Sequence, residues 1–182
     1  MKKQALLIID IQNDYFAGGN MALERSYEAG NNATKVLKYF REINRPVIHI
    51  QHKSVKSGAT FFIPDTKGVK IHECVAPAEN ETVIVKNFPN SFRATELKEK
   101  LNLLEIDELV ITGMMSNMCV DATTRAAFDL GYNCKVIHDA CCAAKLEFNN
   151  TVVDADQVHA AFMAALGSVY AEMLTAEEFI NN

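Results

Sequence analysis

The stretch GMMSNMCVDATTRAAFDLGY, residues 113–132, decides the fold because it joins a buried strand to a helix through a short turn. The apolar run before it, residues 109–112, is typical of a strand that is covered on both faces. Residues 120–130 form an alanine-rich amphipathic pattern with helical spacing. A helix usually begins with Ser, Thr, Asp or Asn, yet Cys119 lies where this helix begins. The cysteine is either a small apolar filler or a thiol at the positive end of a helix.

Apolar runs of the same kind recur along the chain, and helical patterns separate them. Strands are predicted at residues 5–9, 47–50, 82–85, 109–112, 134–137 and 169–174, and helices at 32–43, 94–103, 120–130 and 155–166. Thr175 and Glu178 have the spacing of a capping box that opens a short last helix. Strands that alternate with helices form βαβ units with right-handed crossovers. The sequence therefore predicts an α/β fold: a doubly wound, six-stranded, mainly parallel sheet with helices on both faces, in a three-layer sandwich.

The composition predicts a single domain, residues 1–182, with 49% apolar and 23% charged residues. A net charge of −5 without a Lys/Arg stripe argues against nucleic-acid binding. No apolar run approaches the roughly 20 residues of a membrane span, and the opening MKKQALLIID is interpreted as a strand and not as a signal peptide. Five cysteines without regular spacing predict reduced thiols and a cytoplasmic location.

Three chemically useful residues are expected at the carboxyl ends of the strands, where ligands bind in such sheets. Asp10 follows the first strand, Lys86 ends the third, and Cys119 begins the helix after the fourth. A thiol attacks as the thiolate, and a helix start and an ammonium both lower its pKa. Lys86 is expected to supply that charge, while Asp10 takes the thiol proton and holds the lysine. Attack on an acyl carbon would give a thioester that water later releases.

Each of these residues also has an ordinary structural interpretation. A buried cysteine is usually a small hydrophobe, and an aspartate after a strand is often a turn former. A lysine at a strand end is often a solvated edge residue. The convergence of all three on one edge of the sheet favours a chemical role. The remaining cysteines are interpreted as structural: Cys74, Cys134, Cys141 and Cys142.

Six segments in chain order resemble the isochorismatase-like cysteine hydrolase superfamily, which includes nicotinamidases, N-carbamoylsarcosine amidases, and ureidoacrylate and biuret hydrolases. They are LLIIDIQNDYF, PVIHIQH, DTKGVKIHECVAP, VIVKNFPNSFRATEL, LVITGMMSNMCVDATTRAAFDLGY and VIHDACCA, and together they span nearly the whole chain. The resemblance implies a catalytic triad of Asp10, Lys86 and Cys119. It also implies a cis peptide between Met114 and Met115, and an oxyanion hole formed by the backbone amides of Met115 and Cys119.

The cysteine distinguishes branches of this superfamily. Isochorismatases that cleave a vinyl ether lack it, so Cys119 favours the amidase branch and the hydrolysis of a small amide or ureide through a thioester. Hydrolysis of a non-amide bond is one alternative. A catalytically idle, oligomeric binding module of the same fold is another, although the intact triad argues against it. Because superfamily members form dimers and larger assemblies, the expected partners are a small-molecule substrate and further copies of the chain.

No metal ion or other cofactor is predicted. Nicotinamidases bind a metal through an Asp-x-His pair after the second strand and a histidine in the following loop. Here the pair reads Ile50-Gln51-His52, and the loop position carries Phe61. His49 cannot easily act together with His52, because residues three apart on a strand face opposite sides.

Phe16, Phe61 and Phe62 are predicted to line the substrate pocket. They lie in the turn after Asp10 and in the long irregular stretch at residues 53–80. Aromatic rings there either stack on a planar substrate or belong to the core, and both interpretations stay open. On an extended backbone the adjacent Phe61 and Phe62 point in opposite directions, one toward the cleft and the other toward a neighbouring subunit.

Overall fold

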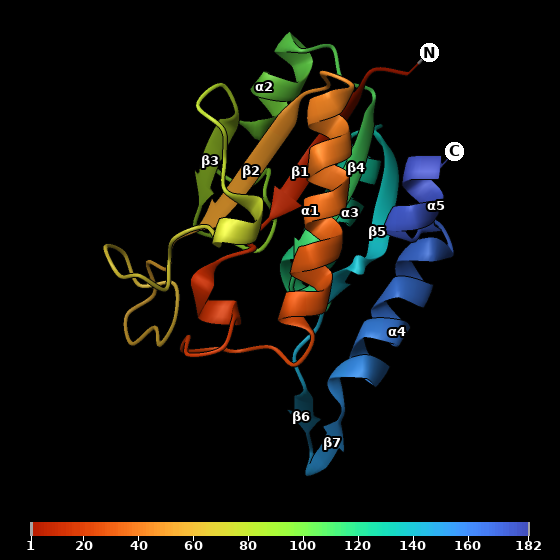
Figure 1. Ribbon diagram of the computed structural model, residues 1–182. Helices are drawn as coiled ribbons and strands as arrows, with labels where there is room; N and C mark the ends of the chain where they lie inside the picture. The colour runs from red at the N-terminus through yellow and green to blue at the C-terminus, as the bar shows by residue number, and fades with distance from the viewer. Residues whose placement is uncertain (1, 182) are drawn as a thin grey trace.

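Six parallel strands form the central sheet of the computed structural model, which describes residues 2–181 (Figure 1). They are β1 (Gln4–Ile9), β2 (Val47–His52), β3 (Thr82–Lys86), β4 (Glu108–Met114), β5 (Asn133–Cys142) and β8 (Glu172–Leu174). Their order is β3-β2-β1-β4-β5-β8, and every neighbouring pair is parallel. The predicted α/β fold class is confirmed.

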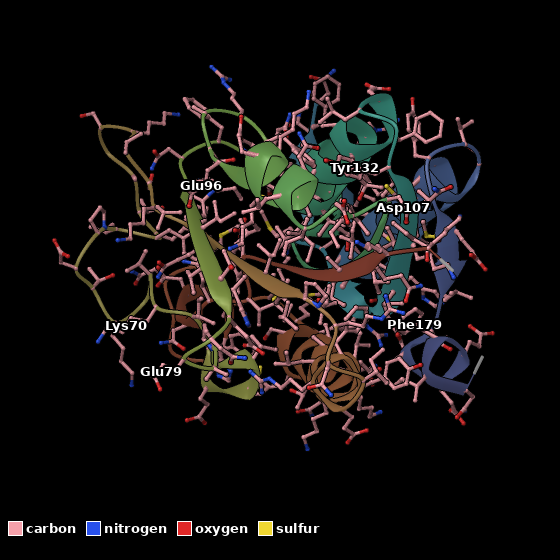
Figure 2. The ribbon with its side chains drawn as sticks, turned by 90° about the horizontal axis from the view of Figure 1, so that it is seen from above. Lys70, Glu79, Glu96, Asp107, Tyr132 and Phe179 are labelled. Carbon is pink, nitrogen blue, oxygen red and sulfur yellow. The ribbon has the colours of Figure 1, made fainter. Side chains whose placement is uncertain are left out.

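Helices cover both faces of this sheet, as Figure 2 shows from above. They are α1 (Ser26–Glu42), α2 (Leu97–Leu103), α3 (Asp121–Asp129), α4 (Ala155–Gly167) and α5 (Ala176–Asn181). Helices α1 and α5 pack in the core of one face, and α2, α3 and α4 contribute to the core of the other. Within residues 2–181, no helix combines the length and the apolar content that would let it cross a bilayer.

The central strand shows why the apolar runs are continuous. Leu6 and Ile8 of β1 belong to the core under α1, whereas Leu7 and Ile9 belong to the core on the opposite face. Successive side chains of a strand point to opposite faces, so a strand that is covered on both faces needs apolar residues at every position. All four side chains are buried, and each contributes about 1.5–3 kcal/mol of hydrophobic stabilisation.

The strand order reverses beside β1, and this arrangement locates the site. From β1 the chain builds β2 and β3 on one side and then crosses to β4 on the other. Such a switch point opens a crevice at the carboxyl ends of the strands. Gly113 of β4 has φ +143°, and a side chain there would collide with the carbonyl of Ile9. Glycine therefore lets the turn after β4 pass closely by the end of β1.

Several predicted boundaries differ from the observed ones. Strand β5 continues to Cys142 rather than ending at residue 137, and α2 begins at Leu97 rather than at residue 94. Helix α1 begins at Ser26 rather than at residue 32. Gly30 looks like a helix breaker in the sequence, but here it makes room for the ring of Phe16. Strand β8 begins at Glu172 rather than at residue 169, because the amide of Tyr170 still bonds to the last turn of α4.

The predicted capping box is present at the start of α5. The amide of Thr175 donates to Oε2 of Glu178 at 2.8 Å. The amide of Glu178 donates to the Thr175 hydroxyl at 3.1 Å. These reciprocal bonds satisfy donors at the helix start, as the spacing indicated.

A two-stranded hairpin that the sequence analysis did not predict stands away from the body of the molecule (Figure 1). It consists of β6 (Leu146–Phe148) and β7 (Thr151–Val153) in antiparallel pairing. Asn149 and Asn150 form its turn with φ of +49° and +61°, as a two-residue type I′ turn requires. The hairpin exposes apolar side chains, above all Phe148, which is 77% exposed.

Candidate active site

A buried lysine lies at the centre of the site. Lys86 Nζ lies 2.6 Å from Oδ2 of Asp10, 3.2 Å from Sγ of Cys119 and 2.9 Å from Nδ1 of His52. The side chains of Lys86 and Asp10 are completely shielded from solvent. An ammonium has three N–H donors, so these three contacts use all of them.

The fold accounts for this convergence. Asp10 follows β1 directly, and Lys86 is the last residue of β3. His52 ends β2 and pairs with Lys86 in the sheet register. Cys119 lies in η3 (Ser116–Val120), a short π-helical turn that leads into α3. The structure thus brings Asp10, Lys86 and Cys119 together and adds His52, which sequence reasoning did not assign to the site.

Asp10 has an uncommon backbone conformation. Its φ of +52° lies in the left-handed region, which few non-glycine residues adopt and which aspartate adopts more readily than most. Apart from its neighbours in the site, no donor within residues 2–181 reaches either oxygen of its carboxylate. Asp10 therefore keeps free lone pairs beside the thiol and can accept a proton.

The electrostatics keep the thiol protonated at rest. Burial raises the pKa of Cys119 well above its usual value, and the charge of Asp10 raises it further. Lys86 lowers this pKa as expected, but its effect is smaller than the two that oppose it. Burial by itself would lower the pKa of Lys86, yet Asp10 and Cys119 outweigh it and the lysine stays an ammonium. The resting state is therefore a thiol beside a buried ion pair.

His52 is a neutral acceptor in this group. Burial lowers its pKa, and the charge of Lys86 lowers it further. An ammonium can only donate, so Nδ1 of His52 accepts and the ring proton is on Nε2. Fully buried Gln12 fixes the backbone of His52: its Nε2 donates to the carbonyl at 2.9 Å, and its Oε1 accepts the amide at 2.7 Å. The sequence signal for this role was a histidine at the end of the predicted second strand, since that strand end lies next to the end of the third strand, which carries Lys86.

The same group contains three atoms of metal-ligating type. Asp10, His52 and Cys119 offer ligand atoms within 4.8 Å of one another. Lys86 contacts all three side chains, so its positive charge lies where a cation would have to bind. His49 is not available, because it faces away and pairs with Glu81 at 2.8 Å. The donor set does not fit a metal ion while Lys86 is protonated.

The turn before Cys119 has the backbone form that the resemblance implies. The peptide between Met114 and Met115 is cis. The carbonyl of Met115 accepts the amides of Met118 at 3.1 Å and Val120 at 3.2 Å. Within residues 2–181, the amide of Met115 donates to no backbone carbonyl. That donor is consequently available to a ligand.

An aromatic wall formed by Tyr15, Phe61 and Phe62 flanks these groups. Phe62 meets Tyr15 edge to face, with ring centroids 4.7 Å apart, and lies 5.7 Å from the ring of His52. Phe61 lies 6.0 Å from Tyr15. Burial raises the pKa of Tyr15, and Cys119 and Asp10 raise it further.

The expectation that Phe61 and Phe62 point in opposite directions is wrong. Phe62 has φ +54°, so the alternation of an extended chain does not apply, and both rings pack on Tyr15. Buried Asp14, which sequence reasoning missed, accepts the amides of Phe62 at 2.6 Å and Asn20 at 3.1 Å. Phe62 is only 1% exposed, so its own chain covers it.

Phe16 is not brought to the site. Its ring stacks on His72 with centroids 3.6 Å apart and an interplanar angle of 15°. It lines a different cavity of about 680 Å³ together with His72. Residues 15 and 16 point in different directions, and Tyr15 takes the place predicted for Phe16.

A family model described as the isochorismatase domain matches residues 4–178, nearly the whole chain. The chain belongs to the isochorismatase family. This is a family of hydrolases, and amidases are among its members.

Individual relatives agree with this assignment. The isochorismatase family protein YddQ of Bacillus subtilis is 52% identical, over 97% of this chain and 98% of its own length. A crystal structure of an isochorismatase hydrolase from Oleispira antarctica is 47% identical and superposes with a TM-score of 0.96, covering 100% of this chain and 97% of that one. Streptothricin hydrolase of Streptomyces noursei is 31% identical over 75% of this chain and 49% of its own length.

Proposed function

We propose that this protein hydrolyses a small amide or ureide without a metal ion, through a thioester on Cys119. The observation that carries the proposal is the buried contact of Lys86 with both Cys119 and Asp10. It combines a nucleophile, a base and a fixed positive charge in a setting shielded from water, where electrostatic interactions are strong.

In the first half of the reaction, the substrate carbonyl binds beside Cys119. Asp10 takes the thiol proton while Sγ forms a bond to the acyl carbon. The charge that develops on the carbonyl oxygen is stabilised by the backbone amides of Met115 and Cys119. Lys86 keeps its proton and balances the charge on sulfur and carboxylate in turn. The C–N bond then breaks, and the proton on Asp10 passes to the departing nitrogen.

The second half releases the acyl group. Asp10, again a carboxylate, takes a proton from water while the water oxygen attacks the thioester carbon. The C–S bond breaks, and the thiolate recovers the proton that Asp10 had accepted. The products are the carboxylic or carbamic acid and the amine or ammonia. The neutral His52 keeps the Lys86 ammonium in place throughout through its Nδ1 lone pair.

The side chains around the thiol support a small substrate. Tyr15 and Phe62 are buried, so of the three rings in the aromatic wall only the partly exposed Phe61 can offer ring surface to a flat amide or ureide group. Streptothricin hydrolase, one of the relatives, is named as a hydrolase of streptothricin. We carry over only the reaction class, hydrolysis, and not that compound.

A substrate panel tests the proposal. Purified protein is incubated with acetamide, benzamide, biuret and N-carbamoylglycine, and released ammonia is measured for the wild type, Cys119→Ala and Cys119→Ser. Turnover of an amide or ureide by the wild type alone is expected, because serine is far harder to deprotonate than cysteine. Full activity in either variant would overturn the thioester mechanism. A vinyl ether is tested in parallel through release of its carbonyl product, and turnover of that compound alone would favour the other branch of the family.

We also propose a homo-oligomer that uses the β6–β7 hairpin as a contact surface. A two-stranded hairpin is at best marginally stable by itself in water. This one exposes Leu146 and Phe148 on one face, at 41% and 77%, and Val152 on the other face, at 54%. A second copy of the chain would cover these side chains.

The five cysteines are all unpaired, which fits the reducing cytoplasm that we propose as the place of action.

A further inference from the structure

A hydrogen bond between Ser116 and His159 reaches the turn before Cys119 from outside that turn. Ser116 directly follows Met115, and it is completely buried. Its Oγ lies 2.7 Å from Nδ1 of His159, which belongs to α4. Burial lowers the pKa of His159, and nearby His138 lowers it further, so the ring is neutral at neutral pH. A neutral imidazole and a hydroxyl form one directed hydrogen bond.

The backbone hydrogen bonds made by the Met115 carbonyl stay within the turn. Met118 and Val120 both donate their amides to the carbonyl of Met115. The Ser116–His159 bond instead joins the turn to helix α4, which packs against η3. Met115 and Cys119 lie on either side of Ser116 in this turn. A rotation of the turn would therefore redirect both of the amides expected to bind the oxyanion.

Helix α4 has an anchor that does not depend on His159. Arg25, just before α1, makes two hydrogen bonds with the carboxylate of Asp156, at 2.6 and 2.7 Å. His159 itself is half-buried and lines a cavity of about 280 Å³ with His138. Replacement of the imidazole therefore leaves the start of α4 attached and forces no large group into a packed core.

We propose that His159 is a positioning residue that acts through Ser116 to fix the direction of the Met115 and Cys119 amides. The inference rests on the proposed function, because it assumes that these amides stabilise an oxyanion. His159 does not touch the reacting atoms. Its effect should be confined to steps in which negative charge develops on a carbonyl oxygen.

Two reagents separate that effect from a general effect on the thiol. Iodoacetamide forms a bond between Sγ and its methylene carbon and expels iodide, so it requires a thiolate but no oxyanion hole. p-Nitrophenyl acetate transfers its acetyl group to Sγ and releases p-nitrophenolate, so it requires the thiolate and the oxyanion donors. Both rates are measured at the same mildly alkaline pH for the wild type and each variant, and mass spectrometry checks that Cys119 is the residue modified.

His159→Leu should lower the acylation rate about 10–100-fold, since misdirected donors lose much of the stabilisation that an oxyanion hole provides. Its alkylation rate should stay within about twofold of wild type, because alkylation involves no oxyanion. His159→Asn, which keeps a polar atom near the position of Nδ1, should recover part of the acylation rate. Ser116→Ala should match His159→Leu, and the double variant should be no worse than either alone. His138→Gln, in the same cavity, is the matched control and should leave both rates unchanged.

Equal losses of acylation and alkylation in His159→Leu would mean that His159 only supports the thiol or the fold, and would overturn the inference. So would unchanged acylation, or additive losses in the double variant. A wild type that is alkylated at Cys119 but never acylated would instead contradict the proposed function. That result is read from the wild type alone. Failure of the proposed function can therefore be told apart from failure of the inference about His159, which is read from the variants.

Discussion

Lys86 and His52 face each other across the carboxyl ends of β3 and β2, with Nζ of the lysine 2.9 Å from Nδ1 of the histidine. The same Nζ contacts Asp10 and Cys119. One buried ammonium thus joins a base, a thiol and an imidazole. A change in any of these four side chains alters the protonation of the others, and this coupling makes the site testable.

Lys86→Met should destabilise the protein. It removes one partner of a fully buried ion pair and leaves the Asp10 carboxylate without its counter-charge. Breaking such a pair from one side typically costs about 3–5 kcal/mol. The free energy of unfolding from urea titration measures the loss. The double variant Lys86→Met/Asp10→Asn has no uncompensated charge and should recover most of it. A single variant as stable as the wild type would mean that Asp10 is not ionised in the folded protein.

The alkylation of Cys119 should be slow at neutral pH and should accelerate with pH. Because burial and Asp10 raise the pKa of the thiol, the thiolate fraction grows about tenfold per pH unit through the accessible range. Asp10→Asn removes a charge that raises this pKa, so alkylation should be faster at a given pH. Rates from iodoacetamide labelling and intact mass check both statements. A plateau already present at neutral pH would show that the thiolate is the resting form.

Removal of metal ions should leave activity intact. The charge of Lys86 lies among Asp10, His52 and Cys119, where a metal ion would otherwise bind. Ammonia release is compared before and after exhaustive chelation, and elemental analysis should find less than one tightly bound metal per chain. One zinc or iron ion per chain, lost together with activity, would contradict this prediction.

Phe148→Asp should shift the mass from light scattering toward that of a monomer. Phe148 is the most exposed aromatic side chain of the hairpin, and a charge there opposes burial against a second copy. Val169→Asp is the matched control, because Val169 is 62% exposed on the segment after α4. Phe62 is unsuitable for this test since its own chain covers it. An unchanged mass for Phe148→Asp, or the same shift for Val169→Asp, would count against the hairpin contact.

Much of the fold was predictable because the pattern of apolar residues along a strand or helix reflects which of its faces are buried. Strands covered on both faces, such as β1 and β4, need continuous apolar runs. The edge strands were visible as apolar runs too, although β3 exposes Val83 and Val85. The hairpin was missed although asparagine, present at both Asn149 and Asn150, is one of the residues that adopts the positive φ of such turns. Its strands are short and exposed, so they carry no core pattern. The early start of α1 was hidden because Gly30 serves packing and not helix termination.

Asp10, Lys86 and Cys119 could be located in the sequence because each lies at the end of a regular element, where topology fixes the position. His52 was considered only as a metal ligand, and its contact with Lys86 depends on the strand register. The aromatic wall was less predictable. The direction of Phe62 depends on a positive φ, which Asp14 supports through a hydrogen bond to the Phe62 amide. No periodic pattern in the sequence reports such a feature.

Peroxide oxidises the thiolate of a cysteine far more readily than the thiol. Cys119 is 5% exposed and is held in the protonated form. Between turnovers it should therefore resist conversion to sulfenic and sulfinic acids, and a cell under oxidative stress would keep this activity longer than that of enzymes with an exposed, ionised cysteine. Under the proposed mechanism, in which the thiol loses its proton only when substrate is bound, the burial of Cys119 would also lengthen the working life of the protein.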